Sequence, residues 1–297
     1  MMTTKKKIVF IANPISGFGT SARLNHIIDK NLSSDLFEYE LYFTKRPGHA
    51  REIAAQAVLE NIPIIVAVGG DGTINEVAYP LLGSSSTLGV IPRGSGNGLA
   101  RHLGIPLNSA KAICTLNKAQ EIKIDTCMLG DNFFINVAGI GFDGQVSKTF
   151  SQQKNRGFLI YAKCILTQFT NFKPILLEIK GKNISREGKY FVVAAANSSQ
   201  YGNNAHIAPA ASINDGFFDL VLMKPFPLIS LPQILTKVFL GKLNTSRFVE
   251  IFPSKKVSIK LPQHFPVHLD GDYKPDLLNF DISINASSLR VLVPAQR

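Results

Sequence analysis

The sequence predicts two domains: an α/β domain with a doubly wound, mainly parallel sheet, then a β-rich antiparallel domain. Three observations support this prediction. The chain has 297 residues, which is long enough for two hydrophobic cores. Strand and helix patterns alternate up to about residue 110, which is typical of parallel βαβ units. From about Ile124 onward the strands are short and separated by Gly, Asn and Pro turns, as in antiparallel sheets.

The first part of the chain alternates buried strands with amphipathic helices. Strands are expected at 7–12, 38–44, 62–68 and 87–91, and helices at 21–30, at 48–60 and after the third strand. The third strand is continuously apolar and rich in Ile and Val, which is typical of a buried parallel strand. In a doubly wound sheet, ligands bind beyond the carboxyl ends of the strands. The turns that follow these strands are therefore the candidate ligand site.

Short strands dominate the second part. They are expected at 124–129, 132–137, 176–179, 190–195, 218–223, 257–260 and 289–293, with helices near 157–169 and 229–240. We place the α/β domain at residues 1–124 and the β-rich domain at 125–284. The C-terminal residues 285–297 are a segment that could return to the first domain.

The charge balance indicates an anionic partner. The formal net charge is +11, which favours a nucleotide, a nucleic acid or an anionic membrane surface. Basic residues are scattered apart from Lys5-Lys6-Lys7 and Lys255-Lys256. Because no basic helix, RNA-binding signature or zinc-finger spacing occurs, nucleic acid is not an expected partner.

The cysteine pattern and the hydropathy predict a cytoplasmic protein. Cys114, Cys127 and Cys164 are odd in number and lack CxxC spacing, which fits a reducing compartment. The N-terminus leads directly into a strand and has no signal-peptide pattern. The apolar stretch from Phe217 to Leu240 is interrupted by Pro and Lys, so we expect no membrane span there. An interfacial surface remains an alternative for this stretch.

The segment Gly69-Gly70-Asp71-Gly72-Thr73-Ile74-Asn75-Glu76-Val77 carries the strongest chemical signal. Glycine lets the backbone approach a ligand closely, and a helix N-terminus presents free N–H groups to an anion. With the carboxylate of Asp71 inside it, this turn indicates phosphoryl transfer. A capping box formed by Thr73 and Glu76 is the structural alternative, which needs no ligand.

Two further Gly-rich turns follow strands that should be neighbours in the sheet. They span 13–19 and 94–98, and Ser95 and Asn97 in the second can cap a helix or bind a phosphate oxygen. Three converging glycine loops indicate a phosphate site far more strongly than one. The chain lacks the P-loop, the complete Rossmann fingerprint and the protein-kinase signatures, which excludes those nucleotide-binding families.

A set of motifs resembles the diacylglycerol kinase catalytic-domain superfamily, which includes bacterial soluble lipid kinases and eukaryotic sphingosine and ceramide kinases. The motifs are Asn13-Pro14-x-Ser16-Gly17, Thr44 followed by Gly48-His49-Ala50, Gly69-Gly70-Asp71-Gly72-Thr73-x-Asn75-Glu76, Pro92-x-Gly94-Ser95-Gly96-Asn97, Ala208-Pro209-x-Ala211 with Asn214-Asp215-Gly216-Phe217-Phe218-Asp219, and Asp270-Gly271-Asp272. The likeness covers nearly the whole chain, and the motif set is highly specific.

The resemblance implies an ATP- and Mg²⁺-dependent kinase that phosphorylates a lipid hydroxyl of diacylglycerol, a sphingoid base or a related lipid. It also implies that residues 1–124 bind the nucleotide and residues 125–284 the lipid. The implied ATP-binding residues are Asn13, Pro14, Ser16, Gly17, Thr44, Gly69, Gly70, Asp71, Gly72, Thr73, Asn75, Glu76, Gly94, Ser95 and Asn97.

The same resemblance assigns the acidic residues. Asp215, with the backbone carbonyls of Ser212 and Phe217, resembles a structural Mg²⁺ site, although an Asp-Gly hairpin turn is the alternative. A carboxylate among Asp272, Asp270 and Asp71 is expected to accept the proton. Asp272 stands where the family usually has Glu, which leaves the identity of the base open.

Other residues give weaker signals. The histidines His49, His102, His206, His264 and His268 show no spacing typical of a metal site or a triad, and His49 is expected to cap a helix or lie in the core. Most phenylalanines are expected in the core, and some could line a lipid-binding groove.

The expected partner is a lipid at a membrane surface, reached by peripheral association, and a homodimer is left open. Two other functions remain as alternatives. One is an NAD kinase, which shares the Gly-Gly-Asp-Gly-Thr turn, and the other is an inactive nucleotide-binding regulator.

Overall fold

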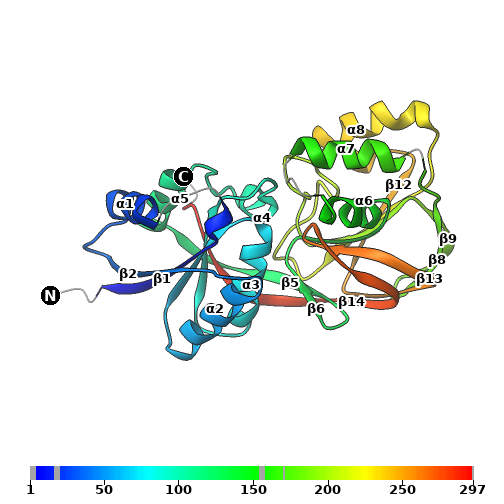
Figure 1. Ribbon diagram of the computed structural model, residues 1–297. Helices are drawn as coiled ribbons and strands as arrows, with labels where there is room; N and C mark the ends of the chain where they lie inside the picture. The colour runs from blue at the N-terminus through cyan, green and yellow to red at the C-terminus, as the bar shows by residue number, and fades with distance from the viewer. Residues whose placement is uncertain (1–4, 17–20, 154–157, 170, 296–297) are drawn as a thin grey trace. The chain divides into compact units, whose positions relative to one another are not determined.

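The computed structural model describes residues 5–16, 21–153, 158–169 and 171–295, which form two compact units (Figure 1). The first unit comprises residues 1–124 and 287–297, and the second comprises residues 125–286. No helix within the described residues is long and apolar enough to cross a bilayer.

A parallel sheet forms the centre of the first unit. Its strands are β1 (Lys6–Ala12), β2 (Phe37–Phe43), β3 (Ile64–Gly69) and β4 (Thr87–Pro92), in the order β2-β1-β3-β4. All neighbouring pairs are parallel, and β3 and β4 are buried along their whole length. The end of β14 (Asp272–Val293) adds a further parallel neighbour, because Val291 pairs with Leu88. The strand order reverses between β1 and β3, which is the point where doubly wound sheets bind ligands.

Helices cover both faces of this sheet. They are α1 (Ser21–Asn31), α2 (His49–Leu59), α3 (Asp71–Leu81), α4 (Gly98–His102) and α5 (Ser109–Leu116). Along the sheet, the step from β1 to β2 goes in one direction, and the steps from β2 to β3 and from β3 to β4 go in the other. Because βαβ crossovers are right-handed, α1 lies on one face of the sheet and α2 and α3 lie on the other. Figure 1 shows this arrangement, with α5 beside α1. The predicted doubly wound α/β fold is confirmed.

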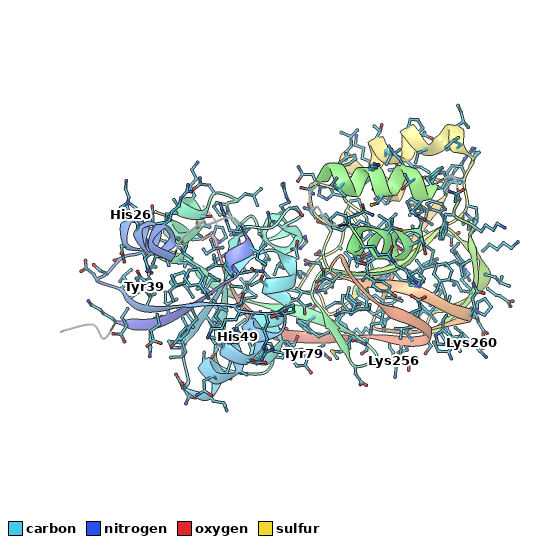
Figure 2. The ribbon with its side chains drawn as sticks, in the orientation of Figure 1. His26, Tyr39, His49, Tyr79, Lys256 and Lys260 are labelled. Atoms are coloured by element: carbon cyan, nitrogen blue, oxygen red, sulfur yellow. The ribbon has the colours of Figure 1, made fainter. Side chains whose placement is uncertain are left out.

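An antiparallel sheet forms the second unit, as predicted. Its strands are β7 (Val137–Gly141), β10 (Val192–Ala196), β11 (Phe218–Met223), β12 (Val249–Ser254) and β13 (Lys256–Leu269), in the order β12-β11-β10-β7-β13-β14. The hairpin of β8 (Ile175–Gly181) and β9 (Ile184–Tyr190) pairs with β13, while β5 (Gln120–Leu129) pairs with β14 and with β6 (Asn132–Phe134). The exposed Lys256 and Lys260 of β13 alternate with buried Val257 and Ile259, as period-two pleating requires (Figure 2).

The second unit has two cores, one on each face of its sheet. Val193, Ala195, Leu220 and Leu222 contribute to the core shared with β8 and β13. The adjacent residues along each strand, such as Val192 and Val221, point to the opposite face and contribute to a second core that helices complete. These helices are α6 (Phe142–Ser151), α7 (Phe158–Phe169) and α8 (Leu231–Phe239), and Figure 1 shows them stacked over one face.

The strand pattern differs from the prediction in several places, and β9 and β12 were not predicted at all. The segment expected as one strand at 132–137 is split into β6 and the start of β7. The expected strand at 289–293 is the end of the much longer β14. Residues 279–285 in the middle of β14 alternate polar and apolar side chains, which is a strand pattern that the sequence analysis missed.

Candidate functional site

Two glycine loops of the first unit meet through their backbones. A Cβ added to Gly94 would lie 2.6 Å from the Cα of Gly70, and one added to Gly70 would lie 3.0 Å from the Cα of Gly94. Such distances admit no side chain at either position. The amide of Arg93 also donates to the carbonyl of Gly69 at 2.7 Å. The predicted convergence of these loops at one sheet edge is therefore observed.

Asn13 and Thr44 follow their strands at the same edge. The amide of Asn13 donates to Val68 and that of Thr44 donates to Ala12, which extends the parallel ladder beyond the strands. The Oδ1 of Asn13 accepts from the amide of Ile15 at 3.0 Å and shapes the 3₁₀ turn Pro14–Ser16. Gly17, the remaining member of this expected ATP-binding loop, lies outside the described residues.

The loop that contains Gly69 and Gly70 leads directly into helix α3. Helix α3 begins at Asp71, with Gly70 as its N-cap, so Asp71, Gly72 and Thr73 form its first turn. A Cβ on Gly69 would lie 2.5 Å from the Oγ1 of Thr73, so the strand end and the helix start are closely packed. The half-buried Asp71 thus stands at the end of a helix where backbone N–H groups remain available to an anion.

The capping-box alternative for Thr73 and Glu76 is wrong. The cap residue is Gly70, and no side chain caps the helix. The Oε1 of Glu76 instead accepts a hydrogen bond at 2.9 Å from the amide of Gly48. Gly48 is the N-cap residue of α2. Glu76 therefore fixes the loop after β2 to α3, and Asn75 lies beside it on the second turn of the helix.

The loop after β4 is held by its own asparagine. The Oδ1 of Asn97 accepts from the amide of Gly94 at 2.8 Å, and its Nδ2 donates to the carbonyl of Gly94 at 2.8 Å. Asn97 is buried and has a positive φ of 52° at the start of α4. Its side chain thus shapes the loop, whereas Ser95 at the tip is exposed.

Helices α2 and α3 are joined next to these loops. The Nδ1 of His49 accepts from the amide of Lys45 at 3.0 Å, and Lys45 precedes the helix. His49 therefore fixes the turn that leads into α2, and the capping role predicted for it is not observed. Two residues further along α2, the guanidinium of Arg51 lies 3.6 Å from the centre of the Tyr79 ring on α3. Figure 2 labels His49 and Tyr79 in this part of the unit.

In the second unit, Asp270 is fully engaged by backbone amides. Its Oδ1 accepts from Asn136 at 2.7 Å and from Val137 at 3.1 Å, and its Oδ2 accepts from Ile135 at 3.0 Å. The side chain thereby fixes the turn between β6 and β7. A carboxylate that accepts three backbone hydrogen bonds has a mainly structural role.

Asp272 has a different environment. Asp270 and Gly271 both have positive φ, 51° and 89°, and form a two-residue hairpin whose flanking residues Leu269 and Asp272 pair. Asp272 is exposed at the start of β14. Of the two predicted acids, Asp272 is thus the more exposed to solvent.

A buried hydrogen-bond network, which the sequence analysis missed, holds this hairpin in place. The Nδ1 of His268 accepts from the amide of Gly271 at 3.3 Å, so its Nε2 carries the proton and donates to the Oδ2 of Asp143 at 3.2 Å. The hydroxyl of Tyr201 donates to the same Oδ2 at 2.8 Å, and the amide of Gly144 donates to Oδ1 at 2.8 Å. The carboxylate of Asp143 is thus satisfied, and His268 is a fixed support rather than an isolated core residue.

The turn at Asp215 is not the hairpin that was weighed as an alternative. Its Oδ1 accepts from the amide of Phe217 at 3.0 Å, and the amide of Gly216 donates to the buried Oδ2 of Asp125 at 2.6 Å. Asp125 was overlooked, although a charge inside the apolar run 124–129 is itself a signal. The turn is thus attached to β5 instead of joining two strands.

Asn197 connects the Asp215 turn to the Asp270 hairpin. Its Nδ2 donates to the carbonyls of Asp125 at 2.8 Å and of Ile135 at 2.7 Å, and it is fully buried. Ile135 belongs to the turn that Asp270 holds. Burial, followed by the charges of Asp270 and Asp125, raises the pKa of the Cys127 thiol well above its usual value. The second unit thus concentrates negative charge around these two turns.

Asp215 and its surroundings suit a hard cation. Burial, and then the charge of Asp215, raises the pKa of Asp219, so two carboxylates repel each other here. The hydrogen bond from the amide of Phe217 uses the Oδ1 of Asp215, and the carbonyls of Ser212 and Phe217 lie within three residues of Asp215 in the chain. Mg²⁺ prefers such oxygen ligands. No cluster of three or more His, Cys, Asp or Glu side chains that could hold a metal occurs in the described parts of the chain.

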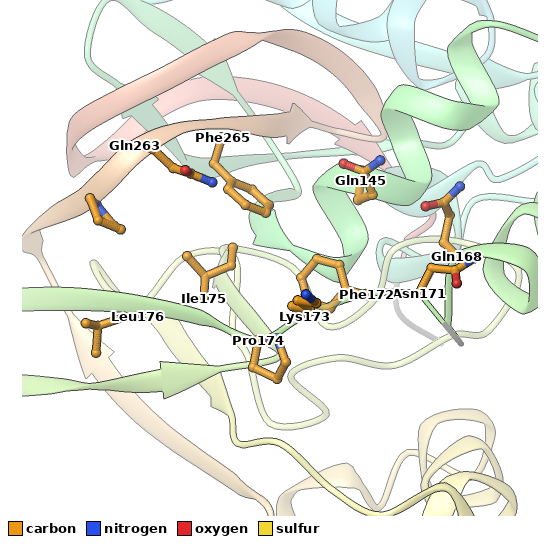
Figure 3. A pocket seen from close by; sticks show the side chains of 11 residues that line it. Gln145, Gln168, Asn171, Phe172, Lys173, Pro174, Ile175, Leu176, Gln263 and Phe265 are labelled. Carbon is orange, nitrogen blue, oxygen red and sulfur yellow. The ribbon is translucent and has the colours of Figure 1, made fainter.

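A pocket of about 490 Å³ opens elsewhere in the second unit (Figure 3). Phe172, Ile175 and Phe265 form its apolar part, and Gln145, Gln168 and Asn171 lie at its polar side. None of the predicted site residues lines it. The phenylalanines 133, 134 and 142 are buried, as expected for core residues.

Comparison with known proteins identifies the class. Residues 7–129 match the model of the diacylglycerol kinase catalytic domain, and residues 136–293 match the YegS C-terminal NAD kinase beta sandwich-like domain. The chain is 31% identical over 282 residues to a diacylglycerol kinase of Bacillus subtilis, covering 90% of both. It is 28% identical over 276 residues to a diacylglycerol kinase of Staphylococcus carnosus, covering 91% of this chain and 89% of that protein.

A solved structure supports the same fold. The crystal structure of a diacylglycerol kinase from Bacillus anthracis superposes with a TM-score of 0.74 at 21% identity, covering 99% of this chain and 98% of that one. The family models and the curated relatives define the class as phosphotransferases that act on lipids. This chain belongs to the diacylglycerol kinase family of lipid kinases. The family resemblance seen in the sequence motifs is thereby confirmed.

Proposed function

We propose that this kinase transfers the γ-phosphoryl group of ATP, with Mg²⁺, to a hydroxyl of diacylglycerol, a sphingoid base or a related lipid. The observation that carries the proposal is the backbone contact between Gly70 and Gly94 at the edge where β1, β3 and β4 end. The glycines leave the backbone free of side chains beside the start of α3, whose N-terminal peptide groups suit a polyphosphate.

The first unit supplies the nucleotide-binding groups in this proposal. The loop at Asn13, Thr44, the segment from Gly69 to Glu76 and the exposed Ser95 bind ATP. Asn97 acts through the shape of its loop, because both polar atoms of its side chain are bound to Gly94. Asp71, at the start of α3, orients the phosphates and their metal.

The second unit supplies the base and the structural metal site in this proposal. Asp272 accepts the proton of the attacking lipid hydroxyl in this proposal, since its side chain is exposed, whereas that of Asp270 is half-buried and holds the turn between β6 and β7. Asp270 positions the hairpin. Asp215, with the carbonyls of Ser212 and Phe217, would hold a structural Mg²⁺. When bound to the nucleotide, Mg²⁺ supplies neutralisation of the phosphate charge.

The proposal includes a cytoplasmic location and peripheral association with a membrane, where a lipid acceptor resides. The net charge of +11 supports an anionic surface as the partner. The acceptor lipid is identified by the experiment below, because none of the quoted motifs distinguishes one lipid from another.

Labelled ATP incubated with a panel of acceptors tests this function. The panel contains diacylglycerol, sphingoid base, ceramide, phosphatidylglycerol, prenols and NAD, and the products are separated by chromatography. We expect label in one lipid class, and none without Mg²⁺. Conversion of NAD to NADP would replace the proposal with an NAD kinase. ATP binding without transfer to any acceptor would indicate a regulator.

A further inference from the structure

Exposed apolar side chains are concentrated in one short segment of the second unit. The large hydrophobic side chains exposed there are Leu228, Ile229, Leu235, Phe239 and Leu240, which we call the α8 face. They lie on α8, on the 3₁₀ turn Leu228–Ser230 before it, and directly after it. An apolar cluster of this kind on a protein surface is typical of an interaction site.

Helix α8 is packed against the protein although its apolar side chains are exposed. Ile234 is buried in the core below, and Val238 packs against the same core, so α8 is anchored by its inner side. Leu235 and Phe239 are four residues apart, and Leu228 precedes Leu235 by seven, which places them along one side of the helix. A helix of a surface layer usually presents polar residues on its outer side.

The charges around this face have one sign. No Asp or Glu occurs between Asp219 and Glu250, whereas Lys224, Lys237, Lys242 and Arg247 do. Lys224 pairs with Glu250, and the ammonium of Lys237 donates to the carbonyl of Thr245 at 2.8 Å. Lys242 and Arg247 are exposed and form no ion pair within the described residues. The face therefore combines apolar side chains with uncompensated positive charge.

The neighbouring helix α7 has the same character. Its Leu166 and Lys163 are exposed, while Cys164 packs into the core that also contains Ile234. No acidic residue occurs from 151 to 177. Figure 1 shows α7 and α8 together in the outermost layer of this unit.

We propose that the α8 face docks onto an anionic lipid bilayer, with Ile229, Phe239 and Leu240 entering the interfacial region. The proposal rests on the proposed function for its biological purpose, since a lipid acceptor resides in the bilayer. Apolar side chains flanked by cations are what amphipathic helices use at anionic interfaces. A second copy of this chain fits less well, because a two-fold contact would bring the cations of the face against one another.

Co-sedimentation with vesicles tests the docking without requiring turnover. The vesicles are phosphatidylcholine alone and phosphatidylcholine mixed with phosphatidylglycerol. The variant is Ile229→Ser with Phe239→Ser, whose wild-type side chains are 87% and 47% exposed. The matched control is Leu59→Ser with Leu36→Ser on the first unit, at 76% and 46% exposed. Thermal unfolding checks that both variants keep the wild-type fold.

We expect the α8 variant to bind mixed vesicles about 30- to 100-fold more weakly, and the control to bind as the wild type. Lys242→Gln should weaken binding about fivefold at low salt and have no effect at high salt. Unchanged binding of the α8 variant, or equal loss in the control, would overturn the proposal. So would a stable dimer in sedimentation equilibrium that the α8 substitutions dissociate without changing vesicle affinity.

The failure of docking and the failure of the proposed function are distinguishable. Phosphate transfer to a lipid presented in detergent micelles does not require a bilayer. A protein that binds vesicles through α8 but phosphorylates no lipid in micelles would refute only the kinase assignment. One that phosphorylates lipid in micelles while α8 substitutions leave vesicle binding intact would refute only the docking.

Discussion

The loops of the first unit approach one another through backbone atoms, whereas the acidic turns of the second unit are held by buried side chains. Gly70 and Gly94 leave no room for a Cβ between their loops. In contrast, Asp270 and Asn197 hold their turns with five hydrogen bonds to backbone groups. The comparison teaches that substitutions should act differently in the two units. Changes in the first should alter ligand affinity, and changes in the second should alter stability unless they affect an exposed acid.

The largest effect is expected at the exposed acid. Asp272→Asn should lower kcat about 10²- to 10⁴-fold, because a positioned base contributes that much, while the melting temperature stays unchanged. Steady-state kinetics and thermal unfolding measure both quantities. Asp131→Asn, at an exposed acid of the same unit, is the control and should keep wild-type turnover. Near-normal turnover of the Asp272 variant would remove this residue from the mechanism.

The next largest effect concerns the stability of the second unit. Asn197→Ala leaves the buried carbonyls of Asp125 and Ile135 without their donor, which should lower the free energy of unfolding by about 2–4 kcal/mol. Denaturant titration measures this change. The exposed Asn244→Ala should change it by less than about 0.5 kcal/mol. Equal effects of the two substitutions would contradict the connecting role given to Asn197.

A smaller effect is expected at the glycine contact. Gly94→Ala introduces a Cβ 2.6 Å from the Cα of Gly70, so the two loops must separate. We expect the affinity for ATP to fall about tenfold, on the order of 1–2 kcal/mol, with a smaller change in kcat. Isothermal titration calorimetry measures the affinity. Gly188→Ala is the control, because its Cβ would meet the Tyr190 ring at an ordinary 3.6 Å. An unaltered ATP affinity in the Gly94 variant would show that the loop contact does not shape the nucleotide site.

The smallest effect concerns Asp219 and pH. Burial and the charge of Asp215 raise the pKa of Asp219, so its ionised form is disfavoured in the folded state. Its contribution to stability is present below the unfolded-state pKa of about 3.9 and is lost as the pH rises through the folded-state pKa. Asp219→Asn should therefore raise the melting temperature by about 2 °C at pH 7, and less near pH 4.

A comparison of melting curves with and without Mg²⁺ sharpens this prediction. A cation held beside Asp215 would reduce the repulsion between the two carboxylates, so Mg²⁺ should diminish the benefit of Asp219→Asn. A benefit that is independent of pH would show that the substitution acts through packing instead of charge.

The first unit could be predicted from sequence more fully than the second for a physical reason. Glycine loops after apolar strands are local patterns, and the parallel order of strands brings those loops to one edge. The residues that hold the acidic turns act over long separations in the chain. Asp143 and His268 are 125 positions apart, and Asn197 contacts residues 62 and 72 positions away. No spacing in the sequence reveals such pairs.

A weaker signal for them does exist. Asp125 and Asp143 interrupt segments that are otherwise apolar, and both are buried in the structure. A charge in such a place must be hydrogen-bonded, so its position alone indicates a buried network. The long β14 also carries a signal, because Phe280, Ile282 and Ile284 alternate with polar residues as period-two pleating requires.

The return of β14 to the first sheet has a consequence for biosynthesis. The unit that begins the chain contains residues 287–297, and Val291 lies beside Leu88 in the parallel sheet. A ribosome makes those residues only after the whole second unit has been translated. The edge of β4 therefore stays open during elongation, and an open strand edge favours pairing with other chains. Completion of the first unit is thus delayed until synthesis has passed the second.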